Sequence, residues 1–530
     1  MSTPVMRPFS GAAPLQNAEF LLVPLIGFAH KKGNLMLNPS RRHFLASTAT
    51  VGASLVAKPA LAAREPEWRD ATQLAEDIRK GYLSAKEAVE HAVAMVETAQ
   101  PVLNFLTVHD FERAMEKVRD GVPAGPFGGV PFLIKDQLSY IGLPTRAGSR
   151  SRRDSPPLSR QSVYTDAFNR AGLVVLGKTA MPEFGFLPTT EPVAGGPTRN
   201  PWDPTRSAGG SSGGAAAAVA AGIVPMAHGS DGGGSLRIPG SCCGLFALKP
   251  SRGRMLGTRN DIDATSTSAD HVLTRSVRDS AGIFALTEDS GSGARFAPVG
   301  QITEPLRRRL RIGLVANTFD GSAPAPDVRK AVLSTAKLLG DLGHEIVPAK
   351  WPIGEKFFQD FLLFWSSGAA AVTAQAKKAQ PDRPLGELFE PFTLGLADLF
   401  AKTPQEKLGE AVAGLKEAAA AYDPWFAGAK LDAVLSPVAF TPPPPLGHLS
   451  GTQTLDALME RLIHYAGFTP YHNVAGSPAM SVPLYWTRKG LPIGSQFCAP
   501  TGGEALLFSL ALQLEAARPW AGKRPKLWFA

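Results

Sequence analysis

The sequence predicts an α/β fold in which the strands of a central sheet alternate with helices. Short apolar runs, such as Phe132–Ile134 and Val174–Leu176, alternate with longer stretches whose apolar residues recur at helical spacing. In addition, 44% of the 530 residues are hydrophobic and 19% are charged, which is typical of a globular protein. Alternation over this length predicts a sheet with a sizeable core, in one large or two ordinary domains.

The first 62 residues are interpreted as a targeting segment outside this fold. Arg41 and Arg42 precede a moderately apolar run, and Ala60-Leu61-Ala62 offers small residues after which a peptidase could cleave. The pattern looks like a twin-arginine export signal and predicts a periplasmic or secreted protein, with a cytoplasmic enzyme as the alternative. Because such signals start close to their arginines, the sequence leaves open whether translation starts at Met1 or Met36.

Charge and cysteine content exclude several other classes of protein. More than half of the formal net charge of +9 lies in residues 1–62, so the rest of the chain has no strong basic character that would indicate nucleic-acid binding. The apolar run Phe20–Ala29 is too short for a membrane span and contains Pro24. The three cysteines are too few and too unevenly spaced for a disulfide framework or a zinc site.

After residue 62 the expected elements follow in order. Ser84-Ala85-Lys86-Glu87 has the pattern of a capping box and begins a helix, and a later apolar strand ends at Lys135. The other expected strands lie at 174–177, 223–227, 310–315, 345–347, 433–437, 479–484 and 491–494. One further helix is expected to end at residue 171, two are expected at 211–221 and 504–517, and a fourth is expected to have Asp327 as its N-cap.

Residues 353–430 form an alanine-rich region that is expected to be helical. Five aromatic residues lie close together near its start: Phe357, Phe358, Phe361, Phe364 and Trp365. Aromatic residues at such spacing more often pack in a core than contact a ligand. Core packing is therefore the favoured interpretation.

Two glycine-rich turns form the candidate functional site. The first contains Ser211 and Ser212, and the second places Ser235 directly after Gly232-Gly233-Gly234. Glycine lets the backbone approach a ligand closely, so these three residues can direct N–H groups at one point. Such a group of donors can form an oxyanion hole, with Ser235 as the nucleophile beside it. A flexible linker is disfavoured, because alanine-rich and apolar segments flank the turns.

A serine nucleophile needs a base, and Lys135 is the candidate. It stands at the end of the apolar strand, where burial could lower the pKa of its amine. On the lysine alone, a solvent-exposed position at the strand end is the favoured interpretation. His228 is the alternative base, but a histidine shortly before a glycine turn is more often a packing or capping residue.

The combination of motifs resembles the amidase signature family. The resemblance runs from about Trp68 to the C-terminus. It rests on Gly128–Asp136, Gly177–Phe184, Gly196–Pro204, Gly209–Gly214, Asp231–Pro239 and Asn473–Ala479. It implies one large domain at 63–530, with a central mixed sheet covered by helices on both faces, and it implies that 353–430 is a variable region that shapes the acyl pocket.

The resemblance also implies a role for each site residue. Ser235 would be the nucleophile, Ser211 a bridging serine preceded by a cis peptide bond, Lys135 the neutral base and Ser212 a supporting residue. Asp231 and Arg237 flank the nucleophile and are expected to fix the loop by hydrogen bonds. Family members more often have threonine in place of Gly232. The implied activity is hydrolysis of a small linear or cyclic amide. The resemblance implies that this reaction needs neither a metal nor an organic cofactor.

The flanking segments are further similar to 6-aminohexanoate cyclic-dimer hydrolases. These segments include Trp68–Thr72, Thr189–Pro192, Ala227–Asp231 and Arg518–Trp520. They do not include the acyl pocket, so simple aliphatic or aryl amides remain equal alternatives to oligomers of 6-aminohexanoate. The sequence leaves open the acyl and amine groups, esterase activity, and whether the protein is a monomer or a homodimer.

Three alternatives come from other classes. Gly210–Gly214 formally matches the nucleophile motif of α/β-hydrolases, with Ser212 as the nucleophile. That interpretation leaves Lys135 and the second glycine turn without a function. The second alternative is the subunit that amidates charged tRNA, which works in the cytoplasm with partner subunits, and the export signal disfavours it. The third is a non-catalytic binding protein, which is disfavoured because Lys135, Ser211 and Ser235 are all present.

Overall fold

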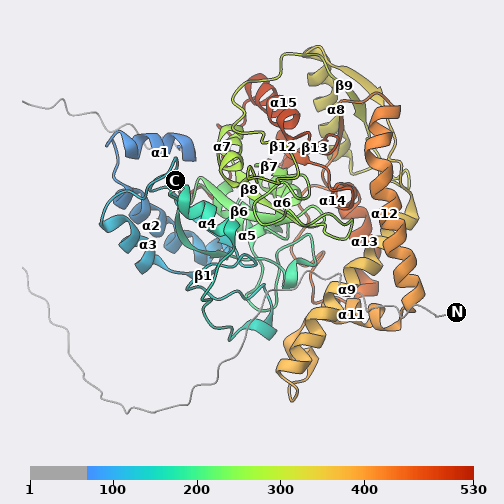
Figure 1. Ribbon diagram of the computed structural model, residues 1–530, viewed down its shortest axis with the longest axis horizontal. Coiled ribbons are helices and arrows are strands. Elements are labelled where there is room, and N and C mark those ends of the chain that lie inside the picture. Colours follow the sequence, from blue (N-terminus) through green and yellow to red (C-terminus); the bar gives the residue numbers. More distant parts are fainter. Residues whose placement is uncertain (1–68) are drawn as a thin grey trace, which may run out of the picture. The chain divides into compact units, whose positions relative to one another are not determined.

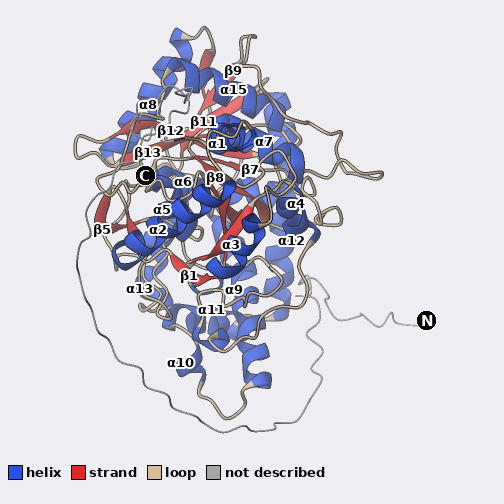
Figure 2. Cartoon of the chain, turned by 90° about the vertical axis from the view of Figure 1, so that its left-hand side faces the viewer, coloured by secondary structure: helices blue, strands red, loops and turns tan. Residues whose placement is uncertain are grey.

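A mixed β-sheet of 11 strands runs through the protein, with helices on both sides (Figures 1 and 2). The computed structural model describes residues 69–530, which form one compact unit. The α/β fold that the sequence predicts, with a central mixed sheet, is confirmed. The described residues do not include the twin-arginine segment, the two alternative start residues Met1 and Met36, or the cleavage position after Ala62.

The strands come from all parts of this unit and pair in the order β1-β3-β2-β6-β8-β7-β12-β13-β11-β9-β10. β2 is parallel to β3 and β6, and β9 is parallel to β10 and β11, while the remaining pairs are antiparallel. β4 and β5 form a separate pair. The strands are β1 (Leu106–His109), β2 (Pro131–Lys135), β3 (Val174–Thr179), β4 (Arg199–Asn200), β5 (Asp203–Ser207), β6 (Met226–Asp231), β7 (Phe246–Lys249), β8 (Ala269–Thr274), β9 (Arg311–Leu314), β10 (Glu345–Pro348), β11 (Ala433–Pro437), β12 (Ala479–Trp486) and β13 (Pro492–Cys498).

The helices cover the sheet and build an additional helical region beside it. In that region α9 packs against α11 and α12, and α11 packs against α13. The helices are α1 (Ala71–Arg79), α2 (Ala85–Leu103), α3 (Phe111–Arg119), α4 (Val163–Arg170), α5 (Gly213–Ala220), α6 (Arg237–Cys243), α7 (Val277–Thr287), α8 (Pro326–Asp341), α9 (Glu355–Ala379), α10 (Leu385–Leu388), α11 (Pro391–Lys402), α12 (Gln405–Gly428), α13 (Leu455–Ala466), α14 (Pro470–Ala475) and α15 (Glu504–Ala517), with short 3-10 turns η1 (Arg150–Arg152) and η2 (Glu183–Gly185).

Both faces of the sheet are buried, and β2 shows how. Phe132 and Ile134 belong to the apolar core that includes α4, α7 and α15, whereas Leu133 belongs to the core that includes α2 and α5. Successive side chains of a strand point to opposite faces. Lys135 has the same parity as Leu133 and therefore points to the face that α5 covers.

Most expected boundaries differ from the structure by a few residues, and two of these differences have a clear physical reason. The strand expected at 223–227 is β6, which begins at Met226, because the chain turns after Gly222 and Pro225 cannot donate to a ladder. Asp327 is not the N-cap of α8: the helix begins with Pro326 at its first position, where the missing N–H of proline costs nothing. The capping box at Ser84 is present as expected.

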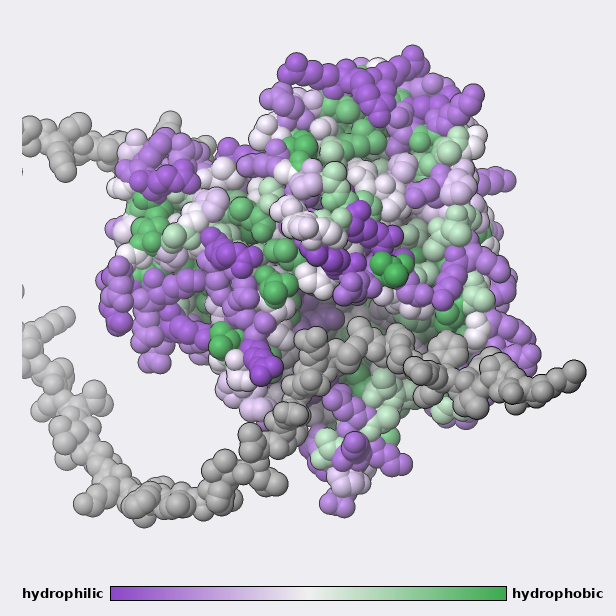
Figure 3. All heavy atoms as spheres, viewed as in Figure 1, coloured by the Kyte–Doolittle hydropathy of each residue, from purple (hydrophilic) through white to green (hydrophobic). Residues whose placement is uncertain are grey.

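The described part of the face in Figure 3 is mostly hydrophilic. On the face that Figure 3 displays, hydrophobic side chains lie in small separate areas among hydrophilic ones. Within residues 69–530, none of the helices combines the length and the apolar character that crossing a membrane requires.

Candidate active site

Three neighbouring parallel strands end at one edge of the sheet and bring the predicted site together. β2 lies between β3 and β6 and is parallel to both. Lys135 ends β2 and Asp231 ends β6. The turn with Ser211 leads into α5, whose Gly214 N–H donates to the Ala180 carbonyl after β3 at 3.1 Å. Ligands of α/β sheets bind beyond the carboxyl ends of parallel strands, which is where these residues lie.

The Lys135 amine is buried and held by serine hydroxyls. Its Nζ lies 2.7 Å from Ser211 Oγ and 2.9 Å from Ser230 Oγ, and it has no carboxylate partner within residues 69–530. Burial lowers the pKa of Lys135 to about 7, although the charges of Asp270 and Asp231 act in the opposite direction. The amine can therefore be neutral near pH 7 and accept a proton. The interpretation as a solvent-exposed strand-end lysine is wrong.

The two serines have different neighbours: Ser211 contacts the Lys135 amine, and Ser235 lines a pocket. The Gly210–Ser211 peptide bond is cis, as the resemblance implies. Ser235 is 9% exposed and lies in the wall of a pocket. Its hydroxyl has no hydrogen-bond partner in the described part of the chain, Ser211 included. The structure thus contains the bond between Lys135 and Ser211, but not the second link to Ser235.

The nucleophile turn provides two of the three predicted oxyanion donors. The N–H groups of Gly232 and Gly233 have no hydrogen-bond partner among the described residues. Gly234 corrects the prediction, because its N–H donates to Asp231 Oδ1 at 2.6 Å and is not free for an oxyanion. The N–H of Ser235 itself is also unpaired within residues 69–530 and can take its place.

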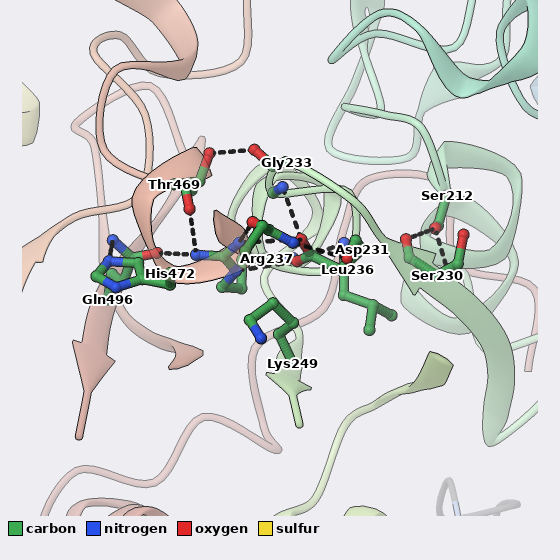
Figure 4. Close-up of polar contacts among 12 residues, drawn as sticks. Ser212, Ser230, Asp231, Gly233, Leu236, Arg237, Lys249, Thr469, His472 and Gln496 are labelled. Atoms are coloured by element: carbon green, nitrogen blue, oxygen red, sulfur yellow. Dashed lines mark hydrogen bonds and ion pairs between the residues drawn. The ribbon is translucent and has the colours of Figure 1, made fainter. Parts of the chain in front are cut away.

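A buried ion pair holds the nucleophile turn (Figure 4). Arg237 Nε and Nη2 each donate to Asp231 at 2.9 Å, and both side chains are fully buried. The guanidinium also donates to Asn473 Oδ1 at 2.6 Å and to Gln496 Oε1 at 2.8 Å. Burial alone would raise the pKa of Asp231, but Arg237 and Asn473 together keep it well below its ordinary value. The two charges act on the loop and do not line the pocket.

No residue with a side chain fits at position 234 without a clash. The φ of Gly234 is +130°, and a Cβ at this position would lie 2.3 Å from Thr469 Oγ1. Thr469 Oγ1 in turn donates to the Gly233 carbonyl at 2.6 Å (Figure 4). The turn therefore packs tightly against the start of α14.

Two further polar residues near Lys135 were not singled out from the sequence. Ser230 Oγ accepts from Lys135 and donates to Gln137 Oε1 at 3.0 Å. Ser212 Oγ donates to the Ser230 carbonyl at 3.2 Å and accepts from its N–H at 3.3 Å (Figure 4). Ser230 lies within the flanking segment Ala227–Asp231, directly before the nucleophile motif, so its position was a signal. The sequence held no comparable signal for Gln137.

The His228 side chain contacts the backbone of Lys135. Its Nδ1 accepts from the Lys135 N–H at 3.3 Å, and its Nε2 lies 3.2 Å from Asp270 Oδ1. Among the hydrogen bonds of residues 69–530, none joins His228 to Ser211 or Ser235. Burial lowers the pKa of His228, although Asp270 acts in the opposite direction. These contacts agree with packing and support as its role.

An apolar pocket opens at Ser235. It encloses about 680 Å³, counted out to its open mouth. Its wall combines the Gly185–Pro188 loop with side chains from five helices, α6, α9, α11, α13 and α14. The side chains that matter below are Phe361, Leu362 and Trp365 of α9, Phe392 of α11, and Met459 and Leu462 of α13.

The structure changes the interpretation of the aromatic residues in the variable region. Phe358, Phe361 and Trp365 belong to or pack against core clusters, as expected, but they also line the pocket, so core packing describes only part of their environment. Phe357, which is buried, belongs to a core cluster with α12 and does not line the pocket. The helix that contributes Met459 and Leu462 was not expected from the sequence at all.

The family profile named Amidase matches residues 87–508 of this chain. The chain belongs to the amidase signature family. As a member of this family it is a hydrolase of the amidase class. The α/β-hydrolase alternative is wrong, because Ser212 is fully buried, bonds to the Ser230 backbone and does not line the pocket.

Relatives within the family match over nearly their full length. The chain is 39% identical over 459 residues to a candidate amidase, AmiC, of Mycobacterium leprae (strain TN), with 85% of this chain and 96% of the relative covered. It is 34% identical over 485 residues to 6-aminohexanoate-cyclic-dimer hydrolase of Pseudomonas sp. (strain NK87), covering 87% and 97%.

Solved structures of family members agree with the fold. The structure of a 6-aminohexanoate cyclic dimer hydrolase complexed with substrate superposes with a TM-score of 0.80 at 31% identity, covering 87% of this chain and 99% of that chain. A bacterial aryl acylamidase of the same family superposes with a TM-score of 0.74 at 25% identity, covering 86% and 97%.

Proposed function

We propose that the protein hydrolyses the C–N bond of a carboxylic amide through an acyl-enzyme on Ser235. The observation that best supports these roles is the buried Lys135 amine, 2.7 Å from the Ser211 hydroxyl and without a carboxylate partner in the described part of the chain. Ser235 lies beside this pair, in the wall of the pocket. A neutral amine can accept the proton of a serine nucleophile through a second hydroxyl.

In the first half of the reaction the Ser235 oxygen attacks the amide carbonyl carbon. The proton of Ser235 passes to Ser211, and the proton of Ser211 passes to Lys135. The unpaired N–H groups of the nucleophile turn donate to the oxyanion of the tetrahedral intermediate. Each donor of this kind contributes about 10²–10³ in rate.

In the second half the C–N bond breaks and the amine leaves. The charged Lys135 returns its proton through Ser211 to the departing nitrogen. Water then attacks the ester carbonyl on Ser235 and gives its proton through Ser211 to Lys135. The bond between the acyl carbon and Ser235 Oγ breaks, the carboxylic acid leaves, and Lys135 returns the proton through Ser211 to Ser235. The covalent intermediate divides one difficult step into two easier ones.

The proposed substrate is a small linear or cyclic amide. The relatives named 6-aminohexanoate-cyclic-dimer hydrolases make that cyclic dimer the first compound to assay. Aliphatic and aryl amides are the next compounds, because a bacterial aryl acylamidase has the same fold.

Intact-protein mass spectrometry after incubation with a fluorophosphonate tests the assignment of the nucleophile. The wild-type protein should gain one adduct, Ser235→Ala should gain none, and Lys135→Ala should react more slowly by about 10²–10⁴. Circular dichroism should verify that each variant is folded.

Ser212→Ala is the comparison variant, because Ser212 is the adjacent serine that the α/β-hydrolase motif would select. Labelling should persist in this variant. Labelling that survives in Ser235→Ala and disappears in Ser212→Ala would contradict the proposed function.

A further inference from the structure

Within residues 69–530, the lining of the pocket at Ser235 offers no ion-pair partner for a charged substrate group. Apart from the Ser235 hydroxyl and the Trp365 indole, its lining side chains are apolar. The indole Nε1 already donates to the Phe186 carbonyl at 3.3 Å. An ammonium or carboxylate group that entered this pocket would lose its hydration without gaining an ion pair, which is strongly unfavourable.

The aromatic part of the wall lies directly against the oxyanion turn. A Cβ at Gly232 would be 3.3 Å from Cη2 of Trp365, and a Cβ at Gly233 would be 3.5 Å from Cζ of Phe361. The two rings stack, with centroids 5.3 Å apart. Because Gly232 has no side chain, the indole can occupy this space. The hydrophobic wall therefore begins at the position of the reacting carbonyl.

The proton path decides which part of the substrate faces this wall. The departing nitrogen receives its proton from Ser211, so it must lie on the Ser211 side. Gly185 lines the pocket there, and a Cβ at Gly185 would be 3.1 Å from Ser211 Oγ. The other substituent of the carbonyl is the acyl group, and the space left for it is the part of the pocket that the side chains of α9, α11 and α13 line.

We propose that this pocket selects an uncharged, hydrophobic acyl group and discriminates against acyl chains that end in an ammonium or carboxylate group. The inference rests on the proposed function, because it uses Ser235 as the acylated residue. It favours neutral amides, such as cyclic dimers and alkyl or aryl amides, over linear 6-aminohexanoate oligomers with a charged amino end.

A matched pair of chromogenic substrates tests the proposal. Heptanoyl-4-nitroanilide and 6-aminohexanoyl-4-nitroanilide have the same chain length and leaving group, and differ by a terminal methyl or ammonium group. At neutral pH the value of kcat/KM should be about 100-fold or more higher for the heptanoyl compound. Equal values, or a preference for the ammonium compound, would overturn the proposal.

Met459 allows a charge to be introduced with a matched control. It is half-buried on α13 and lines the pocket. Met459→Glu should raise kcat/KM for the 6-aminohexanoyl compound relative to the heptanoyl compound by about tenfold or more, because an ion pair becomes available. Met459→Gln, with the same shape and no charge, should not. Melting curves verify that both variants fold.

The outcomes separate this inference from the proposed function. An unchanged substrate ratio in Met459→Glu would mean that the acyl chain does not enter this pocket and would overturn the inference. Fluorophosphonate labelling at Ser235 together with equal turnover of the two anilides would overturn the inference alone. Absence of labelling at Ser235 in folded wild-type protein would overturn the proposed function itself.

Discussion

At the scale of single residues, the Lys135 amine acts as a base only in its neutral form. Burial lowers its pKa to about 7, so protonation at lower pH removes the base. We expect kcat/KM for a neutral amide to fall about tenfold for each pH unit below 7 and to be level above it. A pH–rate profile between pH 5 and about 9 measures this limb.

The pH below which kcat/KM falls, here called the acid limb of the profile, should depend on the charge of Asp270. The negative charge of Asp270 favours the protonated lysine and so raises the pKa of Lys135. Asp270→Asn should therefore move the acid limb to lower pH. Asp341→Asn, which alters an exposed pair with Lys337 on α8, is the control and should leave the limb in place. A limb that is unchanged in Asp270→Asn would contradict the assignment of the limb to Lys135.

Arg237 should be needed for stability, because it is the partner of a fully buried carboxylate. Arg237→Met leaves Asp231 charged and uncompensated, which should lower the free energy of unfolding by about 3–5 kcal/mol. Lys337→Met removes an exposed pair and should change it little. Urea unfolding curves compare the two variants. Equal unfolding midpoints would show that the buried pair does not stabilise the turn.

The proposed catalytic residues could be picked out because each lies in a short local motif. Ser211, Ser235 and Lys135 could be found without knowing any long-range contact. The partner of the Gly234 N–H could not, because it depends on how Asp231 turns toward Arg237 and Asn473. Local sequence therefore predicts which groups are present, and tertiary packing decides which of them are free.

At the scale of elements, α5 connects the bridging serine to the sheet through a close backbone approach. A Cβ at Gly214 would lie 2.5 Å from the Ala180 nitrogen and 2.6 Å from the Phe105 carbonyl oxygen. Gly214→Ala must push α5 away from β3, which should lower the free energy of unfolding by about 1–3 kcal/mol. It should also lower kcat/KM, because Ser211 precedes this helix.

Gly409 in α12 provides the matched control for a glycine within a helix. No heavy atom lies within 4 Å of a Cβ built there. Gly409→Ala should therefore raise the free energy of unfolding by about 0.5–1 kcal/mol and leave kcat/KM unchanged. Thermal unfolding and an amidase assay measure both variants. If the two alanine variants were equally stable, the close approach of α5 would not matter.

Element types were predicted more accurately than their environment. The short apolar run Phe132–Ile134 predicts a strand, and the structure has β2 there. The aromatic residues of α9 could not be divided between core and pocket from their spacing, since Phe357 and Phe361 lie on the same helix but face different neighbours. That division depends on α13, which approaches from a distant part of the chain.

At the scale of the whole molecule, the strand order could not be read from the sequence. β7 pairs with β12, and β11 pairs with β9 and β13. These neighbours are far apart in the chain, and no local pattern specifies their register. The fold class was nevertheless predictable, because alternation of strands and helices depends on local pattern alone.

The remaining whole-molecule proposal is export through the twin-arginine route, with Arg41 and Arg42 as the signal. The three cysteines are free and buried in the described unit, which agrees with a protein that does not depend on disulfides formed after export. Changing both arginines to lysine keeps the charge and removes the twin-arginine pattern. We expect the double variant to stay in the cytoplasm.

Cell fractionation with a matched control decides this proposal. Lys58→Arg alters another basic residue of the segment without making or breaking an arginine pair, and should leave export unchanged. Mass spectrometry of the exported wild-type protein should give an N-terminus at Ala63, because the small residues before it form the cleavage pattern. Export of the Arg41→Lys/Arg42→Lys protein at the wild-type level would contradict the twin-arginine assignment. Cleavage at another position would contradict only the assigned peptidase site, since the arginines and the small residues are independent features of the segment.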